Sequence, residues 1–295
     1  HFRTPTQNEL AQLMVGRKVT LQVQAPVSSV KREKIEEPVL QVDKLRLKAR
    51  AGSGSKRDRL NGLSFSIGSG EIVGIAGVEG NGQSELIQAL LHPREPECFS
   101  SGSIRLFGRE IAHGTRWTPE AIKKSGVGVI PEDRHHEGLL LERPVRENFL
   151  LGLQRDPAFS KSGLIRFDQL EKAAEKAIEE YDVRPRSLDV ASGRLSGGNQ
   201  QKVIIAREFQ RKPRFLIAAQ PTRGVDVGAI ESIHRRIFQA REEGAGILLI
   251  SSELDEILTL SDRILVMFEG AIAGEFLRGQ CTEQELGLKM GGARS

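Results

Sequence analysis

The sequence predicts an α/β fold with a mainly parallel central sheet. Two observations carry this prediction. Residues 71–77 form an apolar, strand-like run that leads into a glycine-rich turn and a helix-like segment. Beyond residue 195, strand-like runs alternate with helical segments, an order that favours parallel strands joined by right-handed crossovers. With 295 residues and 38% hydrophobic content, the chain can bury the core of one large domain with subdomains.

The individual elements are predicted from local patterns of apolar residues. Residues 39–67 are expected to form antiparallel strands, and residues 126–130 a further strand. Residues 145–153 and 167–181 have helical periodicity and form a helical insertion. The other expected elements are a helix at 84–91, a helix that begins at the glycine pair 197–198, a strand from 214 with a turn and a helix after it, a strand at 246–251, a strand at 271–276 and a closing helix.

Residues 77–84 have the spacing of a phosphate-binding loop, G-x-x-x-x-G-K-[ST]. In that pattern, backbone N–H groups wrap an anion at a helix N-terminus, the lysine reaches the phosphates and the hydroxyl ligates magnesium. Gln83 replaces the lysine. A charge-assisted bond is worth about 1.5 to 3 kcal/mol, so nucleotide affinity is expected to fall about tenfold to a hundredfold. Ser84 is the candidate magnesium ligand, and a tight turn that binds nothing is the alternative. The residues expected at the nucleotide are Gly77, Gly80, Asn81, Gly82, Gln83, Ser84 and Glu85.

A second glycine-containing loop, LSGGNQQ at residues 195–201, also precedes a helix. A buried-strand pattern and the turn PTRGVD, at residues 221–226, follow it. Together with the phosphate-binding loop, this order of motifs resembles the ATP-binding cassette (ABC) family over about residues 38–281. The resemblance implies a P-loop NTPase fold with a mainly parallel sheet, an antiparallel β subdomain and an inserted helical subdomain at about residues 140–205. Residues 282–295 then form a C-terminal helix and tail.

Within this resemblance, the positions that hydrolyse ATP carry other residues. The second nucleotide strand should end in Asp-Glu, but the chain has Ala219 and Gln220. Alanine offers no metal ligand and glutamine cannot accept a proton, so magnesium binding and general-base action are both impaired. Ser252 stands at the switch-histidine position and Glu132 at the position of the lid glutamine. Residues 43–64 contain no Phe, Tyr or Trp to stack on adenine.

The same resemblance gives the LSGGN loop a role in another domain's site. Two cassettes of this family hold ATP between them head to tail, and each site joins the phosphate loop of one to the LSGGN loop of the other. We therefore expect Ser196, Gly197 and Gly198, with Asn199 beside them, to act on ATP held by a partner cassette, using the helix N-terminus as an anion site. Asp226 is expected to cross the same interface.

The N-terminal segment suggests where the partner lies. Residues 6–16 repeat Thr, Glu, Leu, Met and Gly of residues 282–292 in register. We interpret residues 1–17 as the tail of a preceding cassette and residues 18–38 as a linker, so that residues 1–37 precede the cassette domain. The chain is then the second half of a tandem polypeptide. The alternative is a helix that belongs to this chain alone.

Residues 131–138, with the sequence PEDRHHEG, gather acids, two histidines and an arginine. A catalytic or metal-binding cluster and a solvated loop are two interpretations. The resemblance implies a third, in which residues 132–146 form a transmission surface that contacts the coupling helix of a membrane subunit. Arg134 and Arg143 are candidates to pair with acids there. Further along the chain, Glu253 is expected to cap a helix.

Composition limits the partners. The net charge of +4, from 43 basic and 39 acidic residues, does not call for nucleic acid. No apolar stretch reaches the ~18 residues that span a bilayer, and no signal pattern is present, so we expect a cytoplasmic chain, peripheral on the inner face of the cell membrane. The resemblance implies that transmembrane permease subunits attach it and that a substrate-binding protein takes part indirectly. Cys98 and Cys281 lack metal-ligand spacing and are expected to be free thiols.

Within the family, the motifs PED, LSGGNQQK, PTRGVDVGA and SSELDEI resemble those of the second cassette of tandem ATPases that import simple sugars or nucleosides. The resemblance therefore implies the nucleotide-binding half of an ABC importer. ATP is the expected cofactor, with Mg²⁺ weak or absent in the chain's own site. The sequences GVEGNGQSEL and AAQPTRG favour the nucleoside branch. Two alternatives stay open: a slow self-sufficient ATPase that uses Gln220 or Glu253 as its base, and a soluble cassette of translation or repair.

Overall fold

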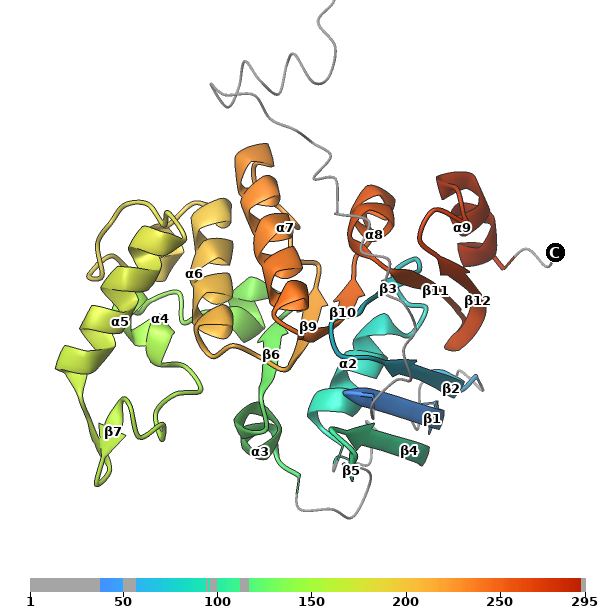
Figure 1. Ribbon diagram of the computed structural model, residues 1–295, viewed down its shortest axis with the longest axis horizontal. Helices are drawn as coiled ribbons and strands as arrows, with labels where there is room; N and C mark the ends of the chain where they lie inside the picture. The colour runs from blue at the N-terminus through green and yellow to red at the C-terminus, as the bar shows by residue number, and fades with distance from the viewer. Residues whose placement is uncertain (1–37, 50–56, 94, 96–99, 112–116, 293–295) are drawn as a thin grey trace, which may run out of the picture. The chain divides into compact units, whose positions relative to one another are not determined.

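The computed structural model describes residues 38–49, 57–93, 95, 100–111 and 117–292 (Figure 1). The expected tail and linker at residues 1–37 lie outside this part of the chain. The described residues form two compact units. The sheet unit contains residues 38–129, 213–220 and 240–292, and the helical unit contains residues 130–212 and 221–239.

An antiparallel sheet in the sheet unit follows the expected region at residues 39–67. Its strands are β1 (Leu40–Leu47), β2 (Leu60–Ile67), β4 (Ser101–Leu106) and β5 (Arg109–Glu110), in the order β2-β1-β4-β5. Each neighbouring pair is antiparallel. Inward side chains of β1 and β2 are buried between exposed ones, the pattern of a sheet that is covered on one face. The antiparallel subdomain is therefore confirmed.

The second sheet is the predicted parallel one. Its strands are β3 (Ile72–Ala76), β6 (Val127–Ile130), β9 (Phe215–Ala219), β10 (Gly246–Ile250), β11 (Arg263–Phe268) and β12 (Ala271–Leu277), in the order β12-β11-β3-β10-β9-β6. Strands β11, β3, β10 and β9 run parallel, and β12 is antiparallel to β11. Every residue of β3, β9 and β10 is buried, which explains why the sequence shows them as continuous apolar runs.

The helices of the sheet unit are α2 (Gln83–Leu91), α3 (Pro119–Lys124), α8 (Leu254–Leu260) and α9 (Glu283–Met290). One apolar cluster combines side chains of α2, of the antiparallel strands β1, β2 and β4, and of the parallel strands β3, β9, β10 and β11. This packing joins β3 firmly to α2, so the loop between them is held at both ends.

The helical unit contains the predicted insertion. Its elements are η1, a π-helical turn (Arg134–Gly138), α4 (Val145–Leu150), the hairpin β7 (Ser160–Lys161) and β8 (Leu164–Ile165), α5 (Phe167–Glu180), η2 (Ser192–Arg194), α6 (Gly197–Gln210) and the start of α7 (Val227–Glu242). Arg236 of α7 donates to the Glu180 carboxylate at 2.9 Å and stacks on the Tyr181 ring at the end of α5. Among the described helices, none is long and apolar enough to cross a membrane.

Candidate functional site

The loop between β3 and α2 has the backbone of a phosphate-binding turn. Gly80 and Gly82 adopt φ values of 89° and 109°, which glycine tolerates best. Gly82 is the N-cap of α2, and the Asn81 N–H donates to the Val78 carbonyl at 3.1 Å. The turn and helix start predicted for residues 77–84 are therefore present, with the helix beginning one residue earlier, at Gln83.

Gln83 fills the space over this loop. The residue is only 9% exposed, and Nε2 donates to the Val78 carbonyl at 3.2 Å. A Cβ atom added to Gly77 would lie 2.4 Å from Nε2. One N–H donor of the Gln83 amide is therefore already bonded to the loop backbone. A lysine at this position would instead offer a positive charge to a triphosphate.

Other loop residues tie the turn to the β11–β12 connection. The Asn81 Oδ1 accepts from the Glu269 N–H at 3.2 Å, and its backbone carbonyl accepts from the Gly270 N–H at 3.0 Å. The buried Nδ2 of Asn81 has no hydrogen-bond partner among the described residues. Ser84 is exposed and Glu85 half-buried in the first turn of α2.

The two substituted positions at the ends of β9 and β10 satisfy one another. Gln220 Oε1 accepts from both the backbone N–H and the hydroxyl of Ser252, each at 3.1 Å. A carbonyl oxygen has two lone pairs, so both acceptor sites are used and only the donating NH₂ group remains. The neighbouring Ala219 is buried and has no ligand atom. This arrangement does not fit a magnesium ion or a general base.

Glu253 occupies the N-cap position of α8, but its side chain makes no capping hydrogen bond. The Ser251 hydroxyl accepts from the Glu253 N–H at 3.1 Å instead. Glu253 therefore has the expected position at the start of α8, but its carboxylate does not accept from the N–H groups of the first turn.

Residues 131–138 are not the plain loop that their polarity suggests, since η1 occupies most of them. Asp133 caps this turn, and its Oδ1 accepts from the His135 and His136 N–H groups at 2.9 and 3.1 Å. Glu132 is half-buried just before the turn. In the described part of the chain, no group of three His, Cys, Asp or Glu side chains could hold a metal ion.

The pair between Asp133 and His136 gives η1 a predictable pH response. His136 Nδ1 lies 2.7 Å from Asp133 Oδ2; this bond raises the pKa of His136 above 6.5 and lowers the pKa of Asp133 from 3.8 to about 2. The ion pair stabilises the fold fully between pH 3.8 and pH 6.5, the ordinary pKa values of the two groups. It is lost as pH rises through the raised His136 pKa, or falls through that of Asp133. NMR titration of the ring protons should show that Asp133→Asn lowers the His136 pKa; an unchanged value would contradict the pairing.

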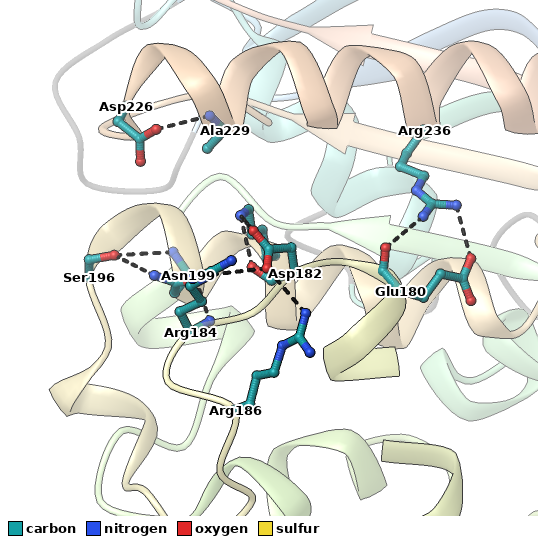
Figure 2. Close-up of polar contacts among 10 residues, drawn as sticks. Glu180, Asp182, Arg184, Arg186, Ser196, Asn199, Asp226, Ala229 and Arg236 are labelled. Carbon is teal, nitrogen blue, oxygen red and sulfur yellow. Dashed lines mark hydrogen bonds and ion pairs between the residues drawn. The ribbon is translucent and has the colours of Figure 1, made fainter. Parts of the chain in front are cut away.

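The LSGGN loop is the N-terminus of α6, in the helical unit. Ser196 is exposed and is the N-cap; its Oγ accepts from the Asn199 N–H at 3.4 Å and from Asn199 Nδ2 at 2.9 Å (Figure 2). The first N–H groups of a helix have no intrahelical acceptor, and the helix dipole favours negative charge there. Gly197 and Gly198 contribute these groups. The arrangement suits an anion with oxygen acceptors.

The glycine pair is required by the turn that packs beside it. A Cβ atom on Gly197 would lie 2.7 Å from the Gly224 carbonyl oxygen, and one on Gly198 would lie 2.7 Å from Asp226 Oδ2. The Asp226 Oδ1 accepts from the Ala229 N–H at 3.0 Å, so the carboxylate is held at the start of α7 (Figure 2). The structure thus brings together the LSGGN loop and Asp226, between which the chain runs through helix α6 and strand β9.

Three residues near this loop, Asp182, Arg184 and Lys202, were not predicted from the sequence. The Arg184 N–H donates to Asn199 Oδ1 at 2.7 Å, and Arg184 Nε lies 3.0 Å from Asp182 Oδ1. Lys202 Nζ donates to the Asp182 carbonyl at 2.9 Å. The charged residues that follow α5, at 182–186, are visible in the sequence. Their contact with α6, however, uses the Arg184 backbone N–H, a group that nearly every residue has.

Polar side chains also join residues 132–146 to α6. Arg134 Nε donates to Gln200 Oε1 at 3.3 Å, and Gln200 Nε2 donates to the Ser192 carbonyl at 3.2 Å. The fully buried Asn148 accepts from the Leu140 N–H at 2.8 Å and donates to Ser192 Oγ at 2.8 Å.

The arginines expected to pair with acids differ from one another. Arg143 lies 3.8 Å from the Glu147 carboxylate, whereas Arg134 donates to the Arg223 carbonyl at 2.6 Å. Backbone and amide acceptors therefore replace the expected acid at Arg134.

Comparison with known proteins agrees with these motifs. Residues 60–223 match the family model described as ABC transporter. The chain is 46% identical over 291 residues to the Guanosine import ATP-binding protein NupO of Bacillus subtilis, covering 99% of this chain and 54% of that protein. It is 45% identical over 287 residues to the Nucleoside import ATP-binding protein NupA of Lactococcus lactis, covering 97% and 54%. The chain thus spans about half the length of these relatives.

The fold has solved counterparts. A structure described as the ATP binding subunit of an ABC transporter superposes with a TM-score of 0.67 at 22% identity, over 86% of this chain and 99% of that one. At that identity the likeness concerns the fold, and it confirms the predicted α/β cassette architecture. The family match covers more than half of the chain, and from it we conclude that this chain belongs to the ABC transporter family.

Proposed function

We propose that this chain is a hydrolytically degenerate ATP-binding half of an importer, which completes the ATP site of a partner cassette. The observation that carries the proposal is a contrast between two loops. Two substituted positions of the chain's own site, Gln220 and Ser252, bond to each other, whereas Ser196 is exposed at an intact helix N-terminus. A cassette can lose its own chemistry and still donate hydrogen bonds to ATP bound elsewhere.

The chain's own site supports only weak nucleotide binding in this proposal. Gln83 brings no charge and donates to the loop carbonyl of Val78. Gln220 has no free acceptor for the proton of an attacking water, and Ala219 cannot ligate magnesium. Residual donors are the backbone of residues 77–85 and the buried Asn81 amide. We therefore expect weak ATP affinity with little dependence on Mg²⁺. Ser84 is the candidate ligand for the metal ion.

The partner and the cargo are inferred from the relatives. The chain spans about half of proteins named as nucleoside and guanosine import ATP-binding proteins. We propose that a second cassette precedes this one in a tandem polypeptide, and that the pair drives nucleoside uptake, with simple sugars as the runner-up. The domain boundaries proposed from sequence are 1–37, 38–281 and 282–295. Permease subunits would bind the transmission surface at residues 132–146 and hold the chain at the inner membrane face, and a substrate-binding protein would deliver cargo to them.

Replacing Ser196 with arginine tests this proposal. ATP hydrolysis by the partner cassette, produced separately, is measured with and without this chain. Wild type is expected to stimulate turnover, whereas Ser196→Arg blocks the phosphate-facing loop and abolishes the stimulation. Ser162→Arg, the same change in the exposed turn between β7 and β8, should retain it.

The other outcomes separate the alternatives. Stimulation by Ser196→Arg equal to wild type would contradict the role of this loop. Magnesium-dependent turnover by the chain alone, lost in Gln220→Ala or Glu253→Ala, would support a self-sufficient ATPase. If separate cassettes show no stimulation, the same substitutions in the tandem polypeptide decide whether the covalent link is required.

A further inference from the structure

We propose that Asn199 is a positioning residue that turns the Ser196 hydroxyl proton outward, so that Ser196 can only donate towards a ligand. The inference rests on the proposed function and names the device that prepares the same loop. Its basis is the hydrogen-bond geometry around α6, where one side-chain amide joins the segment after α5 to the N-cap serine (Figure 2).

The orientation of the Asn199 amide is determined by its neighbour on the other side. The Arg184 backbone N–H, 2.7 Å from Asn199 Oδ1, can only donate. The amide oxygen must therefore face Arg184, and the amide nitrogen must face Ser196, at 2.9 Å. The assignment of oxygen and nitrogen follows from the network, since the reverse orientation would place two donors against each other.

The Ser196 hydroxyl then has both acceptor positions occupied. Its Oγ receives Asn199 Nδ2 at 2.9 Å and the Asn199 backbone N–H at 3.4 Å. A serine hydroxyl has two lone pairs and one proton, so the proton is left to point away from these donors. Ser196 is exposed, and the oxygens of a triphosphate accept hydrogen bonds and do not donate them. The Ser196 hydroxyl is thus oriented to donate a hydrogen bond, which is what a phosphate oxygen needs.

The segment that orients Asn199 is itself attached to α6. Lys202, one turn after Asn199 and only 18% exposed in its side chain, donates to the Asp182 carbonyl at 2.9 Å. Arg184 Nε pairs with the Asp182 carboxylate at 3.0 Å. Two residues of one helix therefore hold residues 182–184 in place, and the Arg184 N–H stays where Asn199 needs it.

Asn199→Asp is the sharpest test because it reverses the polarity at nearly constant shape. One carboxylate oxygen still accepts from Arg184, but the other now accepts from the Ser196 hydroxyl and leaves one Oγ lone pair facing the ligand. With the intact polypeptide and its partner cassette, we expect turnover to fall more than the roughly tenfold loss expected for Asn199→Ala, which merely frees the hydroxyl. Gln210→Glu adds the same charge at the far end of α6 and should leave turnover within about twofold.

A double-mutant cycle with Ser196→Ala separates positioning from structure. If Asn199 acts through the Ser196 hydroxyl, Asn199→Ala should change turnover less than about twofold once Ser196 is alanine. An equal loss in both backgrounds, or wild-type turnover in Asn199→Asp, would overturn the inference. If instead Ser196→Arg keeps wild-type turnover in the tandem polypeptide as well as with separate cassettes, the proposed function itself has failed.

A spectroscopic readout on the chain alone tests the hydrogen bond without turnover. The side-chain amide protons of Asn199 should exchange slowly with solvent in ¹⁵N NMR spectra, and Ser196→Ala should speed this exchange by removing the acceptor. Fast exchange in wild type, or exchange that Ser196→Ala does not alter, would overturn the inference whatever the transport assays show.

Discussion

Replacing Arg207 with methionine is expected to lower the free energy of unfolding by about 3 to 5 kcal/mol. The Arg207 side chain is 4% exposed and Nε lies 2.9 Å from the carboxylate of Glu208, whose side chain is 1% exposed. Its Nη1 donates to the Gly138 carbonyl at 2.9 Å and to the Asn148 carbonyl at 3.2 Å. Methionine fills similar volume but satisfies none of these acceptors, so buried polar groups lose their compensation.

Denaturant unfolding of two further variants makes this prediction specific. Arg207→Lys keeps the charge but loses the planar fork, so its loss should be intermediate. Arg235→Met removes an exposed pair with Glu231 on α7, at 2.8 Å, and should cost at most about 0.5 kcal/mol. Equal losses in Arg207→Met and Arg235→Met would show that the buried network contributes little. Because Arg207 bonds to carbonyls of η1 and α4, its loss should also disturb the transmission surface that we propose at residues 132–146.

Gly74→Ala is expected to destabilise the sheet unit by about 3 kcal/mol. Gly74 lies in β3, between β10 and β11. A Cβ atom there would meet Ser261 Oγ at 2.1 Å and Ser261 Cβ at 3.0 Å. Ser261 is fully buried, and the strand is paired on both sides, so neither partner can move away cheaply.

Two further variants serve as controls for the Gly74 prediction. Ser261→Gly in the same chain removes the two nearest atoms in conflict, leaving Ile257 Cγ2 at 3.2 Å, and should recover most of the lost stability. Thermal and denaturant unfolding measure both variants. Gly287→Ala in α9 meets nothing within 4 Å and should raise stability by up to about 1 kcal/mol through helix propensity. Failure of Ser261→Gly to rescue Gly74→Ala would place the damage elsewhere.

The architecture could be predicted because its signals are local. Strands β3, β9 and β10 are buried on both faces, and a strand without an exposed face has to be apolar along its whole length. The start of α6 was equally legible, since Ser196 is a favoured N-cap and two glycines follow it. Element boundaries shifted by a few residues, as at α4, which ends at Leu150 where residues up to 153 were expected to be helical.

The sequence predicted which residues occupy the candidate sites but not the contacts that they make. Sequence identified Gln83, Gln220 and Ser252 as substitutions in a recognisable pattern. It did not show that Gln83 bonds to Val78, or that Gln220 and Ser252, which are 32 residues apart, satisfy each other. The first contact closes within one loop, over five residues, and the second joins the loops that follow two parallel strands. No periodicity in these loops encodes either partner.

The amino-acid sequence by itself determined the order of strands and helices, the family motifs and the chemical types at each motif position. These properties depend on burial and capping, which repeat over a few residues. Tertiary structure alone decided the polarity of the LSGGN loop. The Ser196 hydroxyl receives its direction from Asn199, and Asn199 receives its own from the Arg184 backbone 15 residues earlier. A backbone N–H is common to nearly every residue, so only its position in the folded chain makes it specific.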